Sequence, residues 1–89
     1  MNNYPIIHPG LTWRLLDGEA VIVSPVTGEI RVLNQVGAEI WQMVANDFTF
    51  AQIVSAITKQ YGLSAKEAES DLSNFLVDLE DRGLISWQK

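Results

Sequence analysis

The sequence of 89 residues contains no cysteine and a single histidine, His8. The missing thiols exclude disulfide bonds, thiolate zinc sites and cysteine nucleophiles. A metal site would need carboxylates for nearly all of its ligands, so we expect no metal and no other cofactor. Because small secreted domains often carry disulfides, their absence favours a reducing compartment, and we expect a cytoplasmic protein.

Long apolar runs and basic residues are also scarce. No apolar run reaches about 18 residues and residues 1–9 lack a basic stretch before an apolar one, so we expect neither a membrane span nor a signal peptide. Six Lys and Arg residues against eleven Asp and Glu residues give a net charge of -5. Nucleic-acid-binding proteins normally carry a basic surface. The charge therefore argues against a nucleic-acid partner and is compatible with a neutral or basic peptide.

Catalytic motifs are missing as well. None of the serines stands in a Gly-x-Ser-x-Gly elbow, and Gly10, Gly18 and Gly28 are isolated rather than part of a phosphate-binding loop. A carrier protein with a prosthetic group on serine would need a helical bundle, which the strand-rich first third of the chain contradicts. We expect a protein that is not an enzyme.

The chain is long enough for one domain over residues 1–89 with one core, and residues 1–10 are expected to form a flexible N-terminal segment. Strands are predicted over residues 12–16, 19–24 and 29–33. Asp17-Gly18 is a preferred pair for a two-residue hairpin, because both positions require positive φ. Pro25-Val26-Thr27-Gly28 is a typical turn. The three strands therefore form an antiparallel meander.

Helical periodicity begins after Asn34, which is placed to cap a helix that ends at about Ala45. Thr49 can cap a second helix, which Gly62 ends. The apolar stripes expected to face the core are, helix by helix, Val36, Ile40, Met43 and Val44; Ile53, Val54, Ile57 and Tyr61; and Ala68, Leu72, Phe75, Leu76 and Leu79.

The third and longest helix opens on a capping box formed by Ser64 and Glu67. It runs to about Arg82 and stops at Gly83, and residues 84–87 then predict a short strand or an extended tail. The order of elements defines an α+β, winged-helix-like domain, with a three-stranded antiparallel sheet followed by three helices.

The third strand, residues 29–33, lies at an edge of this sheet unless another segment covers it. Glu29 and Arg31 are either charges that protect the edge from unwanted pairing, or part of a strand that stays available for a foreign peptide to add to the sheet. The residues alone leave both interpretations open.

The third helix carries six acidic and two basic residues between positions 65 and 82, a charge of -4. Glu67, Asp71, Asn74 and Asp78 recur at steps of three or four residues and lie on one stripe. An acidic stripe disfavours insertion into the major groove of DNA, where a recognition helix would lie. It is either the wall of a groove that attracts basic side chains, or a solvated face without a partner.

The segment Thr27-Gly28-Glu29-Ile30-Arg31-Val32-Leu33-Asn34, followed by a helix with Ala38, Ile40 and Trp41, resembles the PqqD family. The run from Asp71 to Leu79, closing on Gly83-Leu84-Ile85, fits the same pattern. The resemblance implies a recognition element for the leader of a ribosomally made precursor peptide. The free-standing length and the Thr-Gly-Glu motif look most like the B1-type proteins of lasso peptide pathways.

The resemblance also implies how the partners are arranged. A leader would add as a strand to the edge of the third strand, beside the third helix. It would then be presented to a separate leader peptidase, with a cyclase acting afterwards. Leu33 is expected to serve mainly the fold. The implied peptide-binding residues are Glu29, Ile30, Arg31, Val32, Leu33, Asp71, Asn74, Phe75 and Asp78.

Other classes of protein stay open at this point. They are a winged-helix DNA-binding protein, a generic interaction module that dimerises through residues 29–33, and a hydrolase fragment. We expect a monomer without catalytic activity.

Overall fold

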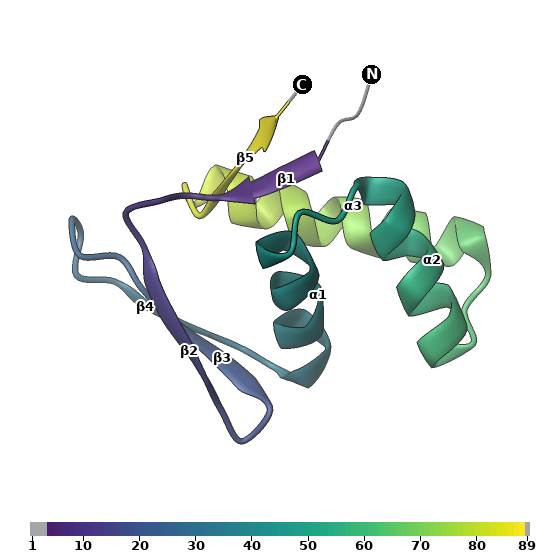
Figure 1. Ribbon diagram of the computed structural model, residues 1–89, viewed down its shortest axis with the longest axis horizontal. Helices are drawn as coiled ribbons and strands as arrows, with labels where there is room; N and C mark the ends of the chain where they lie inside the picture. The colour runs from purple at the N-terminus through teal and green to yellow at the C-terminus, as the bar shows by residue number, and fades with distance from the viewer. Residues whose placement is uncertain (1–3, 89) are drawn as a thin grey trace.

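The computed structural model describes residues 4–88 (Figure 1). The elements follow one another as β1 (Tyr4–Ile7), β2 (Thr12–Leu16), β3 (Glu19–Val23), β4 (Ile30–Leu33), α1 (Gln35–Ala45), α2 (Phe50–Tyr61), α3 (Ala65–Asp81) and β5 (Ile85–Gln88). Strands β2, β3 and β4 form one antiparallel sheet in that order, and β1 and β5 form a second sheet. Within residues 4–88, no helix is long and apolar enough to cross a membrane.

The two turns of the larger sheet confirm the sequence prediction. Asp17 and Gly18 have φ angles of 52° and 82°, as a two-residue hairpin of this kind requires. In the second turn, the N–H of Gly28 donates to the carbonyl of Ser24 at 2.7 Å, and the N–H of Ser24 donates to the carbonyl of Glu29 at 2.9 Å. Because Ser24 and Glu29 belong to the turn, β3 ends one residue before the predicted position 24 and β4 begins one residue after the predicted position 29.

The helix caps are also confirmed. The Asn34 side chain accepts a hydrogen bond from the N–H of Gly37 at 2.9 Å. Thr49 and Ser64 each form a complete capping box, and Gly62 ends α2 in the left-handed conformation with φ 66°. The helix that was expected to run to about Arg82 ends at Asp81.

The N-terminal segment corrects the sequence interpretation. A flexible segment was expected over residues 1–10, but Tyr4–Ile7 form β1, which pairs antiparallel with β5 from Tyr4↔Gln88 to Ile7↔Ile85. A segment of four residues that includes a proline shows too little alternation of apolar and polar side chains to predict a strand. Its partner strand lies at the other end of the chain, so no local turn indicates the pairing. Residues 1–3 lie outside the described residues. The final segment, left open as a strand or a tail, is strand β5.

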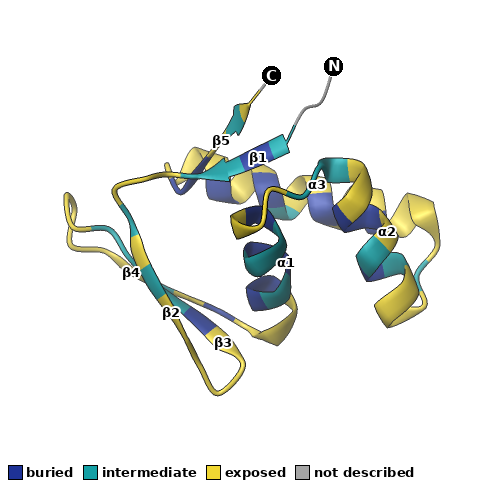
Figure 2. Cartoon of the chain, in the orientation of Figure 1, coloured by how far each residue is buried: buried dark blue, intermediate teal, exposed yellow. Residues whose placement is uncertain are grey.

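The core lies between the sheet and the helices, with α1 packed against β3 and β1, and α2 against α3 (Figure 1). Trp41 on α1 is fully buried and meets Trp13 on β2 edge to face, with ring centroids 6.1 Å apart. The buried residues follow the facing sides of α1 and α3 (Figure 2). The sheet contributes Ala20, Ile22 and Leu33.

Among the residues expected in the core, Met43 is of intermediate burial and packs against the core, and three others are only partly covered. Val36 and Tyr61 are exposed by 43% and 39%, and Phe75 is of intermediate burial. All three border one surface cleft. A helical stripe that lines a cleft has the same spacing as one that lines a core, so the sequence could not separate the two.

Candidate functional site

Strand β4 has a free edge. Within residues 4–88 it pairs only with β3, in the register Ala20↔Leu33 to Val23↔Ile30. The Ser24–Glu29 pair is hydrogen-bonded, and hydrogen-bonded and non-hydrogen-bonded pairs alternate along an antiparallel ladder. The backbone groups of Arg31 and Leu33 therefore form hydrogen bonds with β3. The N–H and C=O groups of Ile30 and Val32 therefore point away from β3, towards the free edge.

The side chains of β4 alternate between the two faces of the sheet. Arg31 and Leu33 share the inner face with their buried partners Ile22 and Ala20, and Leu33 is itself only 7% exposed. Ile30 and Val32 lie on the outer face, where they are 66% and 58% exposed. The residues with free backbone groups thus direct their side chains away from the helices.

Helix α3 runs beside β4, and an ion pair joins the two elements. A guanidinium nitrogen of Arg31 lies 3.6 Å from Asp78 Oδ2, and Arg82 Nε donates to both carboxylate oxygens of Asp78 at 3.1 Å. The side chains of Arg31 and Asp78 are 32% and 49% exposed, so the pair contributes only about 0–1 kcal/mol to stability. It does show that side chains from the strand and the helix meet across the groove between them.

Two hollows lie along this groove, one on each side of the ion pair. The first, here called the polar hollow, has a volume of about 280 Å³ and is lined by Ile22, Ser24, Thr27, Glu29, Arg31, Asp81, Arg82 and Leu84. The second, here called the apolar cleft, has a volume of about 390 Å³ and is lined by Asn34, Val36, Gly37, Ile40, Ile57, Tyr61, Leu63, Asp71, Leu72 and Phe75.

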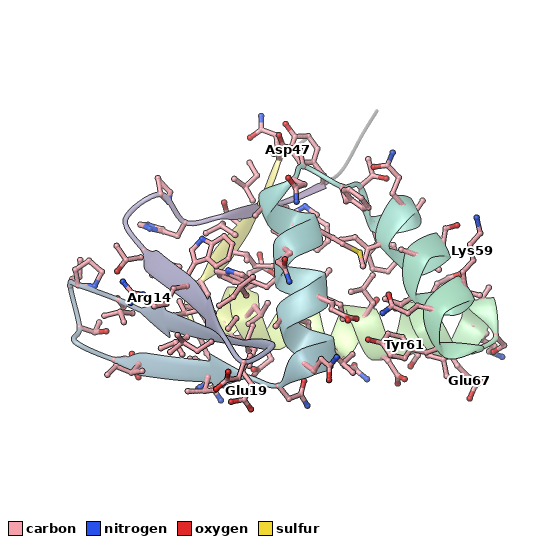
Figure 3. The ribbon with its side chains drawn as sticks, turned by 60° about the horizontal axis from the view of Figure 1, so that its bottom comes forward. Arg14, Glu19, Asp47, Lys59, Tyr61 and Glu67 are labelled. Atoms are coloured by element: carbon pink, nitrogen blue, oxygen red, sulfur yellow. The ribbon has the colours of Figure 1, made fainter. Side chains whose placement is uncertain are left out.

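One wall of the apolar cleft is tied together by hydrogen bonds. The Tyr61 hydroxyl and the Gln60 side-chain amide on α2 both donate to Glu39 Oε2 on α1, and the bond from Gln60 is 2.9 Å long. Figure 3 labels Tyr61 at the carboxyl end of α2. The hydrogen bond to Glu39 raises the pKa of Tyr61, with smaller contributions from burial and from the negative charge of Glu39. These bonds hold the carboxyl end of α2 against α1.

The structure distributes the nine implied binding residues as follows. Glu29 and Arg31 line the polar hollow, and Asp71 and Phe75 line the apolar cleft. Asp78 lies between the hollows through its contact with Arg31. Asn74 is exposed on α3 and lines neither hollow. The other three lie on β4, where Ile30 and Val32 face outwards and Leu33 belongs to the core.

Sequence reasoning missed several residues of the apolar cleft. It placed Val36, Ile40, Ile57 and Tyr61 in the core, and it did not consider Gly37. These four residues lie on the apolar stripes of their helices. The spacing of such a stripe is the same whether it lines a cleft or a core. Among residues 4–88, no three His, Cys, Asp or Glu residues are close enough together to hold a metal ion.

The meander, the free strand edge and the adjacent long helix define a winged-helix-like α+β domain whose sheet can accept a further strand. Residues 19–85 match the PqqD family, described as Coenzyme PQQ synthesis protein D. The chain belongs to this family, which confirms the resemblance inferred from the sequence. No curated protein matches the chain.

Two solved structures are similar to this one over nearly the whole chain. The first is TbiB1 in complex with the TbiA(beta) leader peptide, with 28% identity, a TM-score of 0.88, and coverage of 91% of this chain and 94% of that one. The second is a lasso peptide synthetase B1 complexed with the leader peptide, with 22% identity, a TM-score of 0.85, and coverage of 92% and 96%. The second likeness concerns the fold alone.

Proposed function

We propose that this protein is a non-catalytic adaptor that binds the leader of a ribosomally synthesised precursor peptide by strand addition to β4. The observation that carries this proposal is the free edge of β4 beside α3, with a hollow on each side of the Arg31–Asp78 ion pair. TbiB1, which is 28% identical to this chain, was solved in complex with a leader peptide, which supports the same class of ligand for this chain.

The geometry is sufficient for specific binding. The N–H and C=O groups of Ile30 and Val32 offer four hydrogen bonds to an incoming strand, each with a net contribution of about 0.5–1.5 kcal/mol. An apolar side chain of the peptide that enters the apolar cleft would add about 1–3 kcal/mol. We expect dissociation constants between about micromolar and nanomolar.

The proposal includes the further partners that the resemblance implies. A bound leader would be presented to a separate leader peptidase, and a cyclase would act on the product. The adaptor itself acts as a cytoplasmic monomer in this scheme. Its acidic α3, on which Asp71, Asp78 and Asp81 are all exposed, supports a peptide ligand over DNA, because the phosphate backbone would be repelled.

The outer face of the sheet supports contact with a partner protein. Ile30 and Val32 are exposed there by 66% and 58%, next to the partly buried Val23 and Val21 of β3, and exposed apolar patches typically mark protein interfaces. The helices cover only the inner face of the sheet, and a peptide added to the edge of β4 would leave the outer face accessible. We assign it to the peptidase, since an added leader strand would extend the same surface.

Peptide selection combined with amide exchange tests the binding function. A displayed library made by randomising the TbiA(beta) leader is selected on the wild-type protein, and the best binder, here called the selected peptide, is titrated by calorimetry. We expect the amides of Ile30 and Val32 to become protected from hydrogen exchange in the complex. A library that gives no binder, or protection that falls on another strand, contradicts the proposal.

The partner surface is tested separately with Ile30→Lys. The lysine side chain replaces an exposed apolar one on the outer face, so the affinity for the selected peptide should stay within about 3-fold, while association with the leader peptidase weakens at least about 10-fold. Thr12→Lys, on the same face but on the far strand β2, is the matched control. Equal loss of peptide affinity and peptidase association would contradict the separation of the two surfaces.

A further inference from the structure

Gly37 occupies an unusual place in the apolar cleft. It is buried in the first turn of α1, and it is not among the residues with positive φ, so its backbone conformation does not require glycine. Glycine within a helix is less favourable than alanine by roughly 1 kcal/mol. The missing side chain must therefore be explained by its surroundings.

Those surroundings would accept a Cβ atom only if a neighbouring atom moved by a few tenths of an ångström. A Cβ at position 37 would lie 3.2 Å from the Cβ of Leu33, 3.3 Å from Cζ of Phe75 and 3.4 Å from Oδ1 of Asn34. Leu33 is held in the β4 ladder and Asn34 is held by its capping bond to Gly37. The tip of the Phe75 ring is the only one of the three that can move without disturbing the backbone.

The rest of the cleft lining cannot compensate. Ile40, Ile57 and Leu72 are only 5%, 4% and 1% exposed, so their side chains are fixed by packing in the core. The free width of the cleft therefore depends on the position of the Phe75 ring. Because residue 37 has no side chain, the ring can lie close to α1.

We propose that Gly37 determines which peptide side chain the groove selects. By letting the Phe75 ring close against α1, it keeps the cleft wide enough for one large apolar side chain, leucine or an aromatic residue, of a peptide added to β4. The lining explains this preference, because its polar side-chain groups belong only to Asn34, Asp71 and the hydroxyl of Tyr61. Its other side chains are aliphatic or aromatic. The inference rests on the proposed function and adds the residue that sets specificity.

The test is a comparison of selections on wild-type protein, Gly37→Ala and the double variant Gly37→Ala/Phe75→Leu, all with the randomised TbiA(beta) leader library. The wild type should select a large apolar residue at one position, and Gly37→Ala should select a smaller one at that position only. Replacing this residue by alanine in the selected peptide should weaken binding to the wild type about 30-fold, and binding to Gly37→Ala less than about 3-fold.

The double variant separates the cleft from a general effect on α1. Leucine has no Cζ, so Phe75→Leu removes the atom that an alanine at position 37 would meet, and the preference for a large apolar residue should return. Phe75→Leu alone leaves α1 intact and provides a second measurement if Gly37→Ala does not fold. It widens the cleft and should shift the selection towards a bulkier residue.

The outcomes distinguish this inference from the proposed function. If the wild type selects no peptide, the leader-binding function is wrong and the role of Gly37 with it. If the wild type selects a motif that Gly37→Ala and Phe75→Leu leave unchanged, or if the double variant does not restore it, the adaptor function stands and the role of Gly37 is wrong.

Discussion

The two edges of the three-stranded sheet are chemically similar but differ in what lies beside them. Since each residue of β3 bonds to one neighbouring strand only, Ala20 and Ile22 bond to β4, and the residues between them bond to β2. The free N–H and C=O groups of β2 are then those of Trp13 and Leu15. On β4, the corresponding free groups are those of Ile30 and Val32. Each edge thus offers two residues to an incoming strand.

The difference lies in the second wall. Beside β4, α3 supplies Asp78 to the ion pair with Arg31, and a hollow opens on each side. Beside β2 there is also a hollow, of about 720 Å³, but only Leu11 and residues of β2 and β3 line it, and no helix residue does. None of the ion pairs or side-chain hydrogen bonds of the described residues joins β2 to a helix. A free edge provides hydrogen bonds to any extended peptide, and only an adjacent wall adds selectivity. We therefore expect specific binding at β4 and not at β2.

Proline substitution at the two edges gives the largest expected effect. Val32→Pro removes an outward N–H and places a ring in the path of the added strand, so the selected peptide should bind about 100-fold more weakly or worse. Leu15→Pro, whose N–H also points outwards, is the matched control and should change the affinity by less than about 3-fold. Calorimetry measures the affinities and circular dichroism checks the fold.

Arg31→Pro sharpens this test, because the Arg31 N–H bonds to β3. It should lower the free energy of unfolding by about 3 kcal/mol, unlike Val32→Pro, which lies where proline is tolerated. Equal loss of peptide affinity in Val32→Pro and Leu15→Pro would show that the two edges do not differ in function.

Charge reversal in the groove should have an intermediate effect. Asp78→Lys places a cation beside β4, so a peptide with basic residues near this position should bind about 10-fold more weakly at low ionic strength, and the loss should shrink as salt is added. Glu69→Lys makes the same change of charge on α3 itself, at an exposed residue that faces α2 and lines neither hollow. If the two variants weaken binding equally, only the net charge of the protein matters.

The smallest effect is expected for Tyr61→Phe, at the end of the groove beyond β4. Since the hydroxyl lies in the exposed rim, peptide affinity should change by less than about 3-fold. The contact with Glu39 raises the pKa of Tyr61 above its ordinary value of 10.0. The stability that it contributes is therefore present below about pH 10 and lost as the pH rises through the raised value.

Urea unfolding at about pH 8 and pH 11 measures this contribution. The wild type should lose slightly more stability than Tyr61→Phe between the two pH values. A greater loss in Tyr61→Phe would mean that the hydrogen bond with Glu39 does not stabilise the folded protein.

Much of the fold could be predicted from local sequence. The Asp17-Gly18 hairpin and the caps at Asn34 and Ser64 depend on residues no more than a few positions apart, and all were predicted correctly. The candidate site was predicted less completely. Residues on β4 and α3 were identified, but the contributions of α1 and α2 to the apolar cleft were missed, because Val36 and Tyr61 have the spacing of core residues.

The sequence by itself determined the strands of the meander, the three helices and their ends, since turns and caps are satisfied by neighbouring residues. The tertiary structure decided the pairing of β1 with β5, which backbone groups of β4 stay free, and which apolar side chains line a cleft. These depend on the register of the ladder and on contacts between distant segments, such as Phe75 against Gly37. No local pattern contains that information, because it arises only when α3 packs beside α1.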